Sequence, residues 1–200
     1  MIVLDKRRAK RLSLLRFQSF AELFGNQNPV EVEIGSGRGN YLASRASQSP
    51  GINFLGVEWK TKLVHISGKR SERMCLRNIR FIDVDAREVV NTLQPGSVSV
   101  FHIYFPDPWF KKRHLSRRIL TSNFLAELHT RLMPGALIEI ATDDLDYFQN
   151  IKREVVLSGI SWQESRESIN QRIFNPSIKT LFECKYELLN KPLYYLELKK

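Results

Sequence analysis

The stretch Phe105-Pro-Asp-Pro-Trp-Phe-Lys-Lys-Arg-His114 places an acid, an aromatic ring and several bases next to one another. Two prolines flank Asp107 and restrict the backbone, so its carboxylate should be held in one position. Trp109 offers a face on which a nucleic-acid base could stack, a contact worth roughly 1–3 kcal/mol, whereas a packing aromatic is the alternative. We interpret His114 as one more surface cation. The combination favours a site that holds a base beside a fixed carboxylate and phosphates on the basic side chains.

The net charge of +10 is concentrated in two segments. Residues 1–16 hold six basic residues and one acid, and residues 111–118 hold five basic residues and no acid, which leaves 20 of each sign elsewhere. Binding of a polyanion needs such a dense local patch. A solvated face or a disordered tail is the alternative. We favour that alternative for residues 1–16 taken alone, but not for 111–118, which lie inside the domain.

Glycines follow the short β-rich run 30–34 in the segment Glu33-Ile-Gly-Ser-Gly-Arg-Gly39. The spacing is G-x-G-x-G and differs from the G-x-G-x-x-G of the dinucleotide fingerprint. Taken alone, these glycines could form an ordinary turn. Glu33 changes the interpretation, because an acid before the first glycine would repel a pyrophosphate but suits an ammonium group. S-adenosylmethionine has an amino-acid end and a sulfonium, and it carries no phosphate.

Acidic residues follow three more of the predicted strands. Glu58 could accept hydrogen bonds from both hydroxyls of a ribose. Strand alternation predicts Asp83 and Asp85 on one side, with Asp85-Ala86 nearer the loop and suited to the amino edge of an adenine. Asp143 lies on the same edge as Asp107, and one of the aspartates 143 and 144 should N-cap the next helix. Each acid alone could be an ordinary surface carboxylate, but together they favour an adenosine ligand.

Short β-rich runs alternate with segments of helical periodicity. The predicted strands are 30–34, 53–58, 80–84, 98–104, 136–141 and 193–198, with a further one around 160–167. Leu63, Ile66, Arg70 and Met74 recur at helical spacing, and Pro134-Gly135 is expected to end the helix that contains Leu128. This alternation predicts a parallel sheet with helices on both faces. Such sheets bind ligands at the carboxyl ends of their strands.

The chain shows no repeats and no linker, which predicts a single domain over 26–200 after a basic N-terminal segment 1–25 that could remain mobile. No apolar run reaches the ~18–20 residues of a membrane span, and no secretion signal is evident. Cys75 and Cys184 lie far apart without metal-ligand spacing, so we expect buried or idle reduced thiols and no metal. These features predict a cytoplasmic protein.

On these residues the chain resembles the bacterial tRNA (guanine-N7-)-methyltransferase family, from about residue 30 to Glu183. The most specific match is 106–114 together with Arg117-Arg118. The remaining landmarks follow in order, namely Glu33 to Gly39, Gly56-Val-Glu58, Asp85-Ala86, Ala141-Thr-Asp143 and Thr180-Leu-Phe-Glu183. One departure is Leu181, where the family usually has a lysine.

The resemblance implies a class I S-adenosylmethionine-dependent methyltransferase (Rossmann-like α/β) fold, with a seven-stranded, mostly parallel sheet whose last strand is antiparallel. It implies that S-adenosylmethionine contacts Glu33, Gly35, Gly37, Glu58, Asp85, Ala86 and Asp107, of which Asp107 is also the catalytic residue. Substrate contacts would come from Lys111, Asp143, Thr180, Leu181, Phe182 and Glu183, and tRNA contacts from Arg113, His114, Leu115, Ser116, Arg117 and Arg118. The expected product is 7-methylguanosine at position 46 of tRNA, made by a monomer or homodimer.

Other functions compete with this one. A methyltransferase for another RNA or a small molecule would share the fold, as would an NAD-dependent enzyme, but the basic loop and Glu33 argue against a small neutral substrate and against NAD. A tRNA-binding module without catalysis is a further alternative, which the intact acids argue against. Guanine N7 has a lone pair and no proton, so no general base is required. We therefore expect Asp107 to align the base, since alignment can supply much of the barrier reduction.

Overall fold

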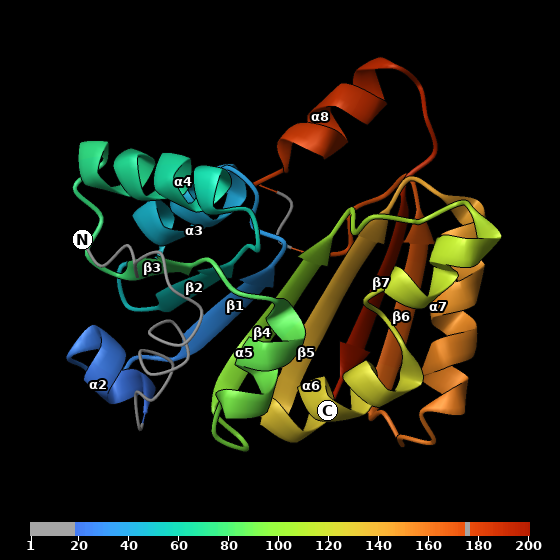
Figure 1. Ribbon diagram of the computed structural model, residues 1–200, viewed down its shortest axis with the longest axis horizontal. Helices are drawn as coiled ribbons and strands as arrows, with labels where there is room; N and C mark the ends of the chain where they lie inside the picture. The colour runs from blue at the N-terminus through green and yellow to red at the C-terminus, as the bar shows by residue number, and fades with distance from the viewer. Residues whose placement is uncertain (1–18, 175–176) are drawn as a thin grey trace.

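One seven-stranded sheet in the order β3-β2-β1-β4-β5-β7-β6 organises the chain (Figure 1). The computed structural model describes residues 19–174 and 177–200. β1 to β5 are parallel, and β7 is antiparallel to both of its neighbours, β5 and β6. The strands are β1 Val30–Ile34, β2 Asn53–Val57, β3 Ile79–Ile82, β4 Val98–Tyr104, β5 Leu132–Thr142, β6 Glu164–Ile169 and β7 Tyr194–Lys199.

Helices connect the strands and cover both faces of the sheet. They are α2 Phe20–Phe24, α3 Asn40–Gln48, α4 Thr61–Arg73, α5 Ala86–Thr92, α6 Ser122–Arg131, α7 Leu145–Leu157, α8 Leu181–Leu188 and the 3₁₀ helix η1 Lys112–Arg117. α5, α6 and α7 contribute to the largest hydrophobic core, whereas α3 and α4 pack on β2 and β3 from the other side. The predicted seven-stranded, mostly parallel sheet with helices on both faces is confirmed.

Residue alternation in β1 separates these two faces. Val30, Val32 and Ile34 join the largest core, so Glu31 and Glu33 point to the opposite face. All five residues of the strand are buried. Burial of a carboxylate is costly unless it is paired, so this face needs partners for two glutamates.

The helical stripe that contains Leu63 and Met74 does not form the buried side of α4. The buried residues are Val64, Ser67, Gly68 and Ser71. Small side chains are needed here because α4 approaches the glycine turn closely: a Cβ placed on Gly39 would lie 2.9 Å from the Ser67 Cβ.

The helix predicted from the spacing of Leu63, Ile66 and Arg70 is present as α4, whereas the expectation that Pro134-Gly135 ends a helix is wrong. α6 ends at Arg131, and Leu132 already pairs with Val98 of β4. The register then shifts, so that Val100 pairs with Leu137. Pro134-Gly135 therefore occupies an irregularity within the long strand β5.

Residues 1–18 of the predicted basic segment lie outside the described residues, but its remainder includes α2. Ser19 caps this helix, and Phe24 is buried in the largest core. Among the described helices, none has the length and apolar content to cross a membrane. Cys75 and Cys184 are free thiols, and both are exposed rather than buried.

Candidate active site

The glycine turn after β1 has left-handed backbone at three positions. The φ angles of Gly35, Gly37 and Gly39 are +79°, +54° and +65°, a region that residues with a Cβ rarely adopt. The amides of Gly35 and Ser36 donate to the Val57 carbonyl at 2.8 and 3.1 Å. The turn is thus fixed to the end of β2, with its backbone against the ligand edge of the sheet.

Glu33 is buried next to this turn, with only 5% of its surface exposed. Its Oε2 atom has no hydrogen-bond partner among the described residues. Burial raises the pKa of Glu33 to about 8; the charge of His102 opposes this shift and that of Glu58 adds to it. A buried carboxylate with an open oxygen is a fitting partner for an ammonium group, and this role of Glu33 stays a prediction.

Glu58 is buried and fixed by two backbone amides. Its Oε2 accepts from the Gly37 amide at 3.1 Å and its Oε1 from the Lys60 amide at 2.9 Å. Each carboxylate oxygen can accept a further hydrogen bond, so hydroxyls of a ribose remain possible partners. Glycine at position 56 is required because a Cβ there would lie 2.3 Å from the Phe81 ring.

The two aspartates after β3 have different environments. The strand ends at Ile82, so the alternation that placed Asp83 and Asp85 on one side does not reach them. Asp83 is buried, whereas Asp85 is exposed and N-caps α5 through the Arg87 amide at 2.9 Å. Ala86 is buried in the first turn of α5.

The loop after β4, which we call the Asp107 loop (residues 105–109), has an unusual backbone at both ends. Phe105 and Trp109 have φ angles of +52° and +49°, which is strained for an aromatic residue. The Phe105 ring stacks on Phe182 at 5.7 Å between centroids. Between these ends Asp107 is exposed at the carboxyl edge of the sheet.

The basic segment follows on η1. Lys111, Arg113, Leu115, Ser116 and Arg117 are exposed, and His114 and Arg118 are half-buried. The Trp109 ring contacts the Arg117 guanidinium at 5.1 Å and the His114 ring at 5.7 Å, which supports the packing role that was the alternative. Phe110, which sequence reasoning passed over, exposes 74% of its surface beside these bases.

The predicted substrate residues at the start of α8 divide into two pairs. Leu181 and Phe182 are exposed. Thr180 and Glu183 are buried and form a capping box at the N-terminus of the helix. Glu183 also pairs with Arg172 and accepts from the Tyr195 hydroxyl at 3.1 Å. Its carboxylate is therefore satisfied inside the protein.

The last predicted substrate residue, Asp143, is half-buried at the end of β5. It accepts a hydrogen bond from Tyr186 of α8, and burial together with this carboxylate raises the pKa of the tyrosine. Asp144 N-caps α7 through the Tyr147 amide at 2.6 Å, as expected for one of the two aspartates. The hydrogen bond between Asp143 and Tyr186 thus connects the end of β5 to α8.

A row of charged side chains behind the glycine turn, buried except for Arg166 at its end, was missed by sequence reasoning. In successive register positions across five strands lie Glu33, His102, Glu139, Glu197 and Arg166. His102 Nδ1 lies 2.8 Å from Glu139 Oε2, and its Nε2 lies 2.9 Å from Glu31 Oε2. Burial opposes a charge on His102, but Tyr41 and these carboxylates outweigh it and raise its pKa well above the ordinary value.

Burial would raise the pKa of Glu31, but His102 and Arg45 outweigh it and lower this pKa to about 2. The sequence signal for this row is the presence of polar residues at alternate positions of buried strands. Which of these residues become neighbours depends on the strand register, which the sequence does not show.

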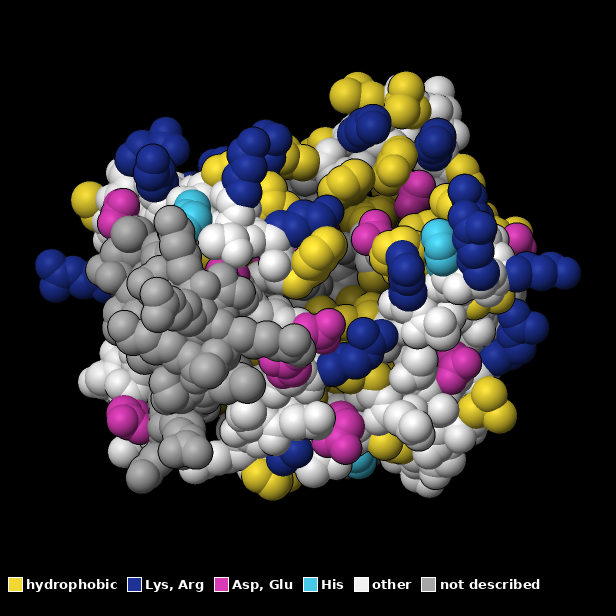
Figure 2. All heavy atoms as spheres, in the orientation of Figure 1, with side chains coloured by type: hydrophobic (Ala, Val, Ile, Leu, Met, Phe, Trp, Pro, Cys, Tyr) yellow, Lys and Arg dark blue, Asp and Glu magenta, His cyan; other side chains and the backbone are white. Residues whose placement is uncertain are grey.

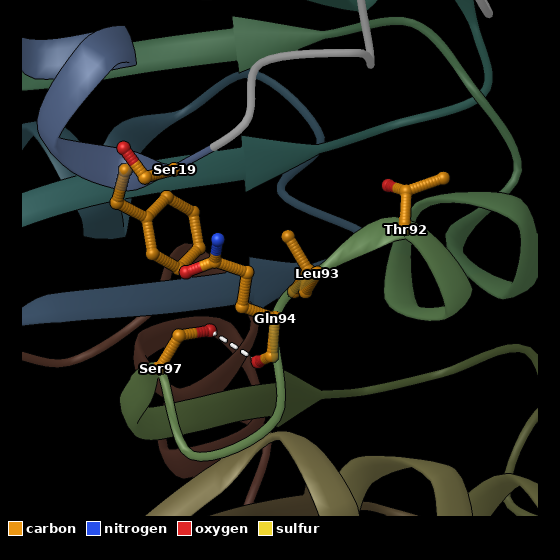
Figure 3. A pocket seen from close by; sticks show the side chains of 6 residues that line it. Ser19, Thr92, Leu93, Gln94 and Ser97 are labelled. Carbon is orange, nitrogen blue, oxygen red and sulfur yellow. Dashed lines mark hydrogen bonds between the residues drawn. The ribbon is translucent and has the colours of Figure 1, made fainter.

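The molecule is hollowed where these parts meet. Figure 2 shows the hollow near the centre of the face, above the ends of β1 and β4 in the orientation of Figure 1, with acidic and basic side chains around it. A separate small pocket lies at the amino end of β4 and is lined by Ser19, Phe20, Thr92, Leu93, Gln94 and Ser97 (Figure 3). It has room for about one water molecule and is no part of this site.

Comparisons with known proteins identify the family. The model of a family described as "Putative methyltransferase" matches residues 27–196. A tRNA (guanine-N(7)-)-methyltransferase of Rubrobacter xylanophilus is 34% identical over 180 residues, which cover 90% of this chain and 80% of that protein. One of Oenococcus oeni is 31% identical and covers 98% of this chain and 90% of its own.

Solved structures agree in fold. An antibiotic-related methyltransferase superposes with a TM-score of 0.65 at 17% identity, covering 100% of this chain and 96% of that one. A 16S rRNA methyltransferase superposes with a TM-score of 0.63 at 15% identity, covering 100% and 98%. With the glycine turn, the buried acid and the Asp107 loop at one edge of this sheet, the chain belongs to the tRNA (guanine-N(7)-)-methyltransferase family.

Proposed function

We propose that the chain transfers a methyl group from S-adenosylmethionine to N7 of a guanine in tRNA, the expected nucleotide being that at position 46. The observation that carries the proposal is the juxtaposition at one sheet edge of Glu33, with an open buried oxygen, and the Asp107 loop followed by basic η1. At this edge Glu33 suits the ammonium group of S-adenosylmethionine, and the basic side chains of η1 suit the phosphates of tRNA.

The residues present fit the methyl donor. Glu33 would hold the ammonium group, Glu58 the ribose hydroxyls, and Asp85 with Ala86 the adenine edge, while Gly35 and Gly37 let the backbone approach closely. When bound, S-adenosylmethionine supplies an activated methyl group on a sulfonium.

The chain's own contribution to the reaction is alignment. Guanine N7 presents a lone pair without a proton, so no side chain has to remove one. Asp107, at the tip of a loop fixed at both ends, accepts hydrogen bonds from the N–H groups of the guanine edge, which adenine does not present in the same pattern. Lys111, Asp143 and the exposed side chains of Leu181 and Phe182 bound the same space and complete the substrate side, with Thr180 and Glu183 holding the start of α8 behind them. Arg113, His114 and Arg117 bind tRNA phosphates.

The experiment is methyl transfer from labelled S-adenosylmethionine to bulk tRNA, followed by nucleoside analysis. Label in 7-methylguanosine supports the proposal, and primer extension then tests position 46. Label in another nucleoside would identify a different RNA methyltransferase. Binding of tRNA without transfer would instead indicate a module that has lost catalysis. Light scattering on the same preparation distinguishes a monomer from a homodimer, the two states that the sequence left open.

A further inference from the structure

We propose that Arg118 is a positioning residue, which holds the Asp107 loop in its strained conformation and leaves phosphate binding to its exposed neighbours on η1. This inference rests on the proposed function, because it concerns the loop that carries Asp107.

The strain at the two ends of the loop needs to be offset by fixed contacts. A left-handed φ at a non-glycine residue is energetically unfavourable and persists only where the surroundings determine it. At the first end, the Phe105 amide donates to the Ala141 carbonyl at 2.7 Å and the ring stacks on Phe182. At the second end, Pro108 has no amide N–H, so its carbonyl is the backbone group of this residue that a partner can hold.

Arg118 supplies that partner. Its Nε donates to the Pro108 carbonyl at 2.8 Å, and its Nη1 donates to Asn150 Oδ1 at 2.9 Å. Its guanidinium also lies over the ring of Tyr147, 4.6 Å from the centroid. Asn150 and Tyr147 both belong to α7, so Arg118 joins the loop to a helix of the rigid core.

The backbone of Arg118 is fixed as well. Its carbonyl accepts from Arg87 Nη2 at 3.1 Å, and Arg87 lies 3.9 Å from Asp85, the cap of α5. In Figure 1 the chain leaves β4, passes over the strand ends and reaches α7. Two helices on the same side of the sheet therefore hold the segment that follows the loop.

Arg117, the adjacent residue, provides the contrast. It is exposed, and its guanidinium lies over the Trp109 ring, 5.1 Å from the centroid. Its exposed hydrogen-bond donors suit a phosphate, whereas two donors and the flat face of Arg118 are already used inside the protein. The two arginines of one sequence motif thus divide into a phosphate ligand and an internal support.

The test compares Arg118→Ala with Arg117→Ala and with Arg153→Ala, an exposed arginine of α7. Three quantities are measured: methyl transfer at saturating tRNA, tRNA affinity as a function of salt, and hydrogen exchange of the amides in residues 104–112. For Arg118→Ala we expect kcat to fall by about 10- to 100-fold, faster exchange of the loop and an unchanged salt slope. For Arg117→Ala the slope should fall by about 1. Arg153→Ala should resemble the parent in kcat and loop exchange.

Two further variants guard against loss of folding. Arg118→Lys keeps the positive charge but replaces the planar fork and flat face of the guanidinium by a single nitrogen, so the present geometry of the two bonds is lost and partial activity is expected. Asn150→Ala removes one partner and leaves Arg118 in place, with a smaller fall in kcat and a smaller rise in exchange. A positioning role is supported if kcat and loop exchange change less in these two variants than in Arg118→Ala, and more than in Arg153→Ala.

The proposal is overturned if Arg118→Ala lowers the salt slope as Arg117→Ala does while kcat and loop exchange stay at the parental values. Hydrogen exchange separates this outcome from failure of the proposed function. If the parent methylates no tRNA but the loop still exchanges faster in Arg118→Ala, the positioning role stands and the assigned reaction is wrong.

Discussion

At the scale of single residues, Glu33 has a charge state that depends on its ligand. The folded pKa is raised to about 8 from 4.5. Between these pH values the folded protein keeps a proton that the unfolded chain has released, so this residue lowers stability progressively as pH rises from about 4.5 to about 8. An ammonium ligand pairs with the ionised carboxylate, so that ionised Glu33 stabilises the liganded protein.

Glu33→Gln should therefore separate stability from ligand binding. Without ligand at pH 8 to 9, we expect the variant to gain at least about 1 kcal/mol, which raises Tm by roughly 2–4 °C. The rise in Tm that S-adenosylmethionine causes in the parent should disappear. Glu72→Gln, on the exposed side of α4, is the control. An unaltered ligand-induced shift in Glu33→Gln would contradict the role of this carboxylate.

Asp107→Asn tests base alignment at the same scale. The side chain keeps its shape but replaces one acceptor oxygen by a donor, so the hydrogen bonds to guanine no longer match. We expect kcat on tRNA transcripts to fall at least about 10-fold with tRNA affinity almost unchanged, since a carboxylate makes no favourable phosphate contact. Full activity with undiminished preference for guanine over adenine would show that Asp107 does not read the base.

At the scale of elements, α8 is held by its first turn. Glu183 is fully buried, with its partner Arg172 only 4% exposed. Glu183→Ala would leave that guanidinium without this carboxylate in the interior, a loss of roughly 3–5 kcal/mol, measurable by thermal unfolding. Thr180→Ala should cost about 1 kcal/mol through loss of the cap.

Glu187 on the same helix is the matched control, because it pairs with Lys179 at the surface. Its replacement by alanine should cost less than about 1 kcal/mol. Equal stability of the Glu183 and Glu187 variants, with activity lost only in the first, would return Glu183 to the substrate contacts that the family resemblance implied.

The elements also show how far the sequence could lead. The alternation of strands and helices was sufficient to predict the sheet. It also predicted the edge that bears the candidate site, because the carboxyl ends of parallel strands meet at one edge of a sheet. The buried side of α4 could not be read from hydrophobic spacing, since Ser67 faces the glycine turn, where a large side chain would not fit. Thr180-x-x-Glu183 has the form of a capping box. This pattern alone could have predicted a structural role for the two residues, which the resemblance assigned to the substrate.

At the scale of the whole molecule, the charge row across the sheet could not be foreseen. Glu33, His102 and Glu139 become neighbours only through the register of β1, β4 and β5, and a shift of one residue would send each to the other face. The same holds for Arg118, whose partners Pro108 and Asn150 are joined only by the fold.

The row predicts loss of stability in acid. The folded pKa of Glu31 is about 2 against 4.5 in the unfolded chain, so its stabilising contribution is complete above about pH 4.5 and is lost as pH falls towards 2. His102→Gln removes the central cation and should cost roughly 3–5 kcal/mol at pH 7. Its urea midpoint should then change less between pH 5 and 3 than the parental one.

His65→Gln, on the exposed side of α4, serves as the control for this comparison. A His102→Gln variant with parental midpoints at both pH values would mean that the buried imidazolium contributes nothing to the sheet.

Association with tRNA is also a property of the whole molecule. Arg113 and Arg117 are exposed, and each phosphate contact contributes to the slope of log K against log salt. The double alanine variant should flatten this slope by about 2, measured by filter binding from low to physiological salt. A slope equal to that of the parent would remove η1 from the RNA-binding surface.

The two exposed cysteines have a practical consequence. Cys75 follows α4 and Cys184 lies on α8, helices drawn on different sides of the hollow in Figures 1 and 2. Both thiols are open to maleimide reagents without any mutation. A donor and an acceptor dye on this natural pair would report, by energy transfer in single molecules, whether α8 approaches α4 when RNA enters between them.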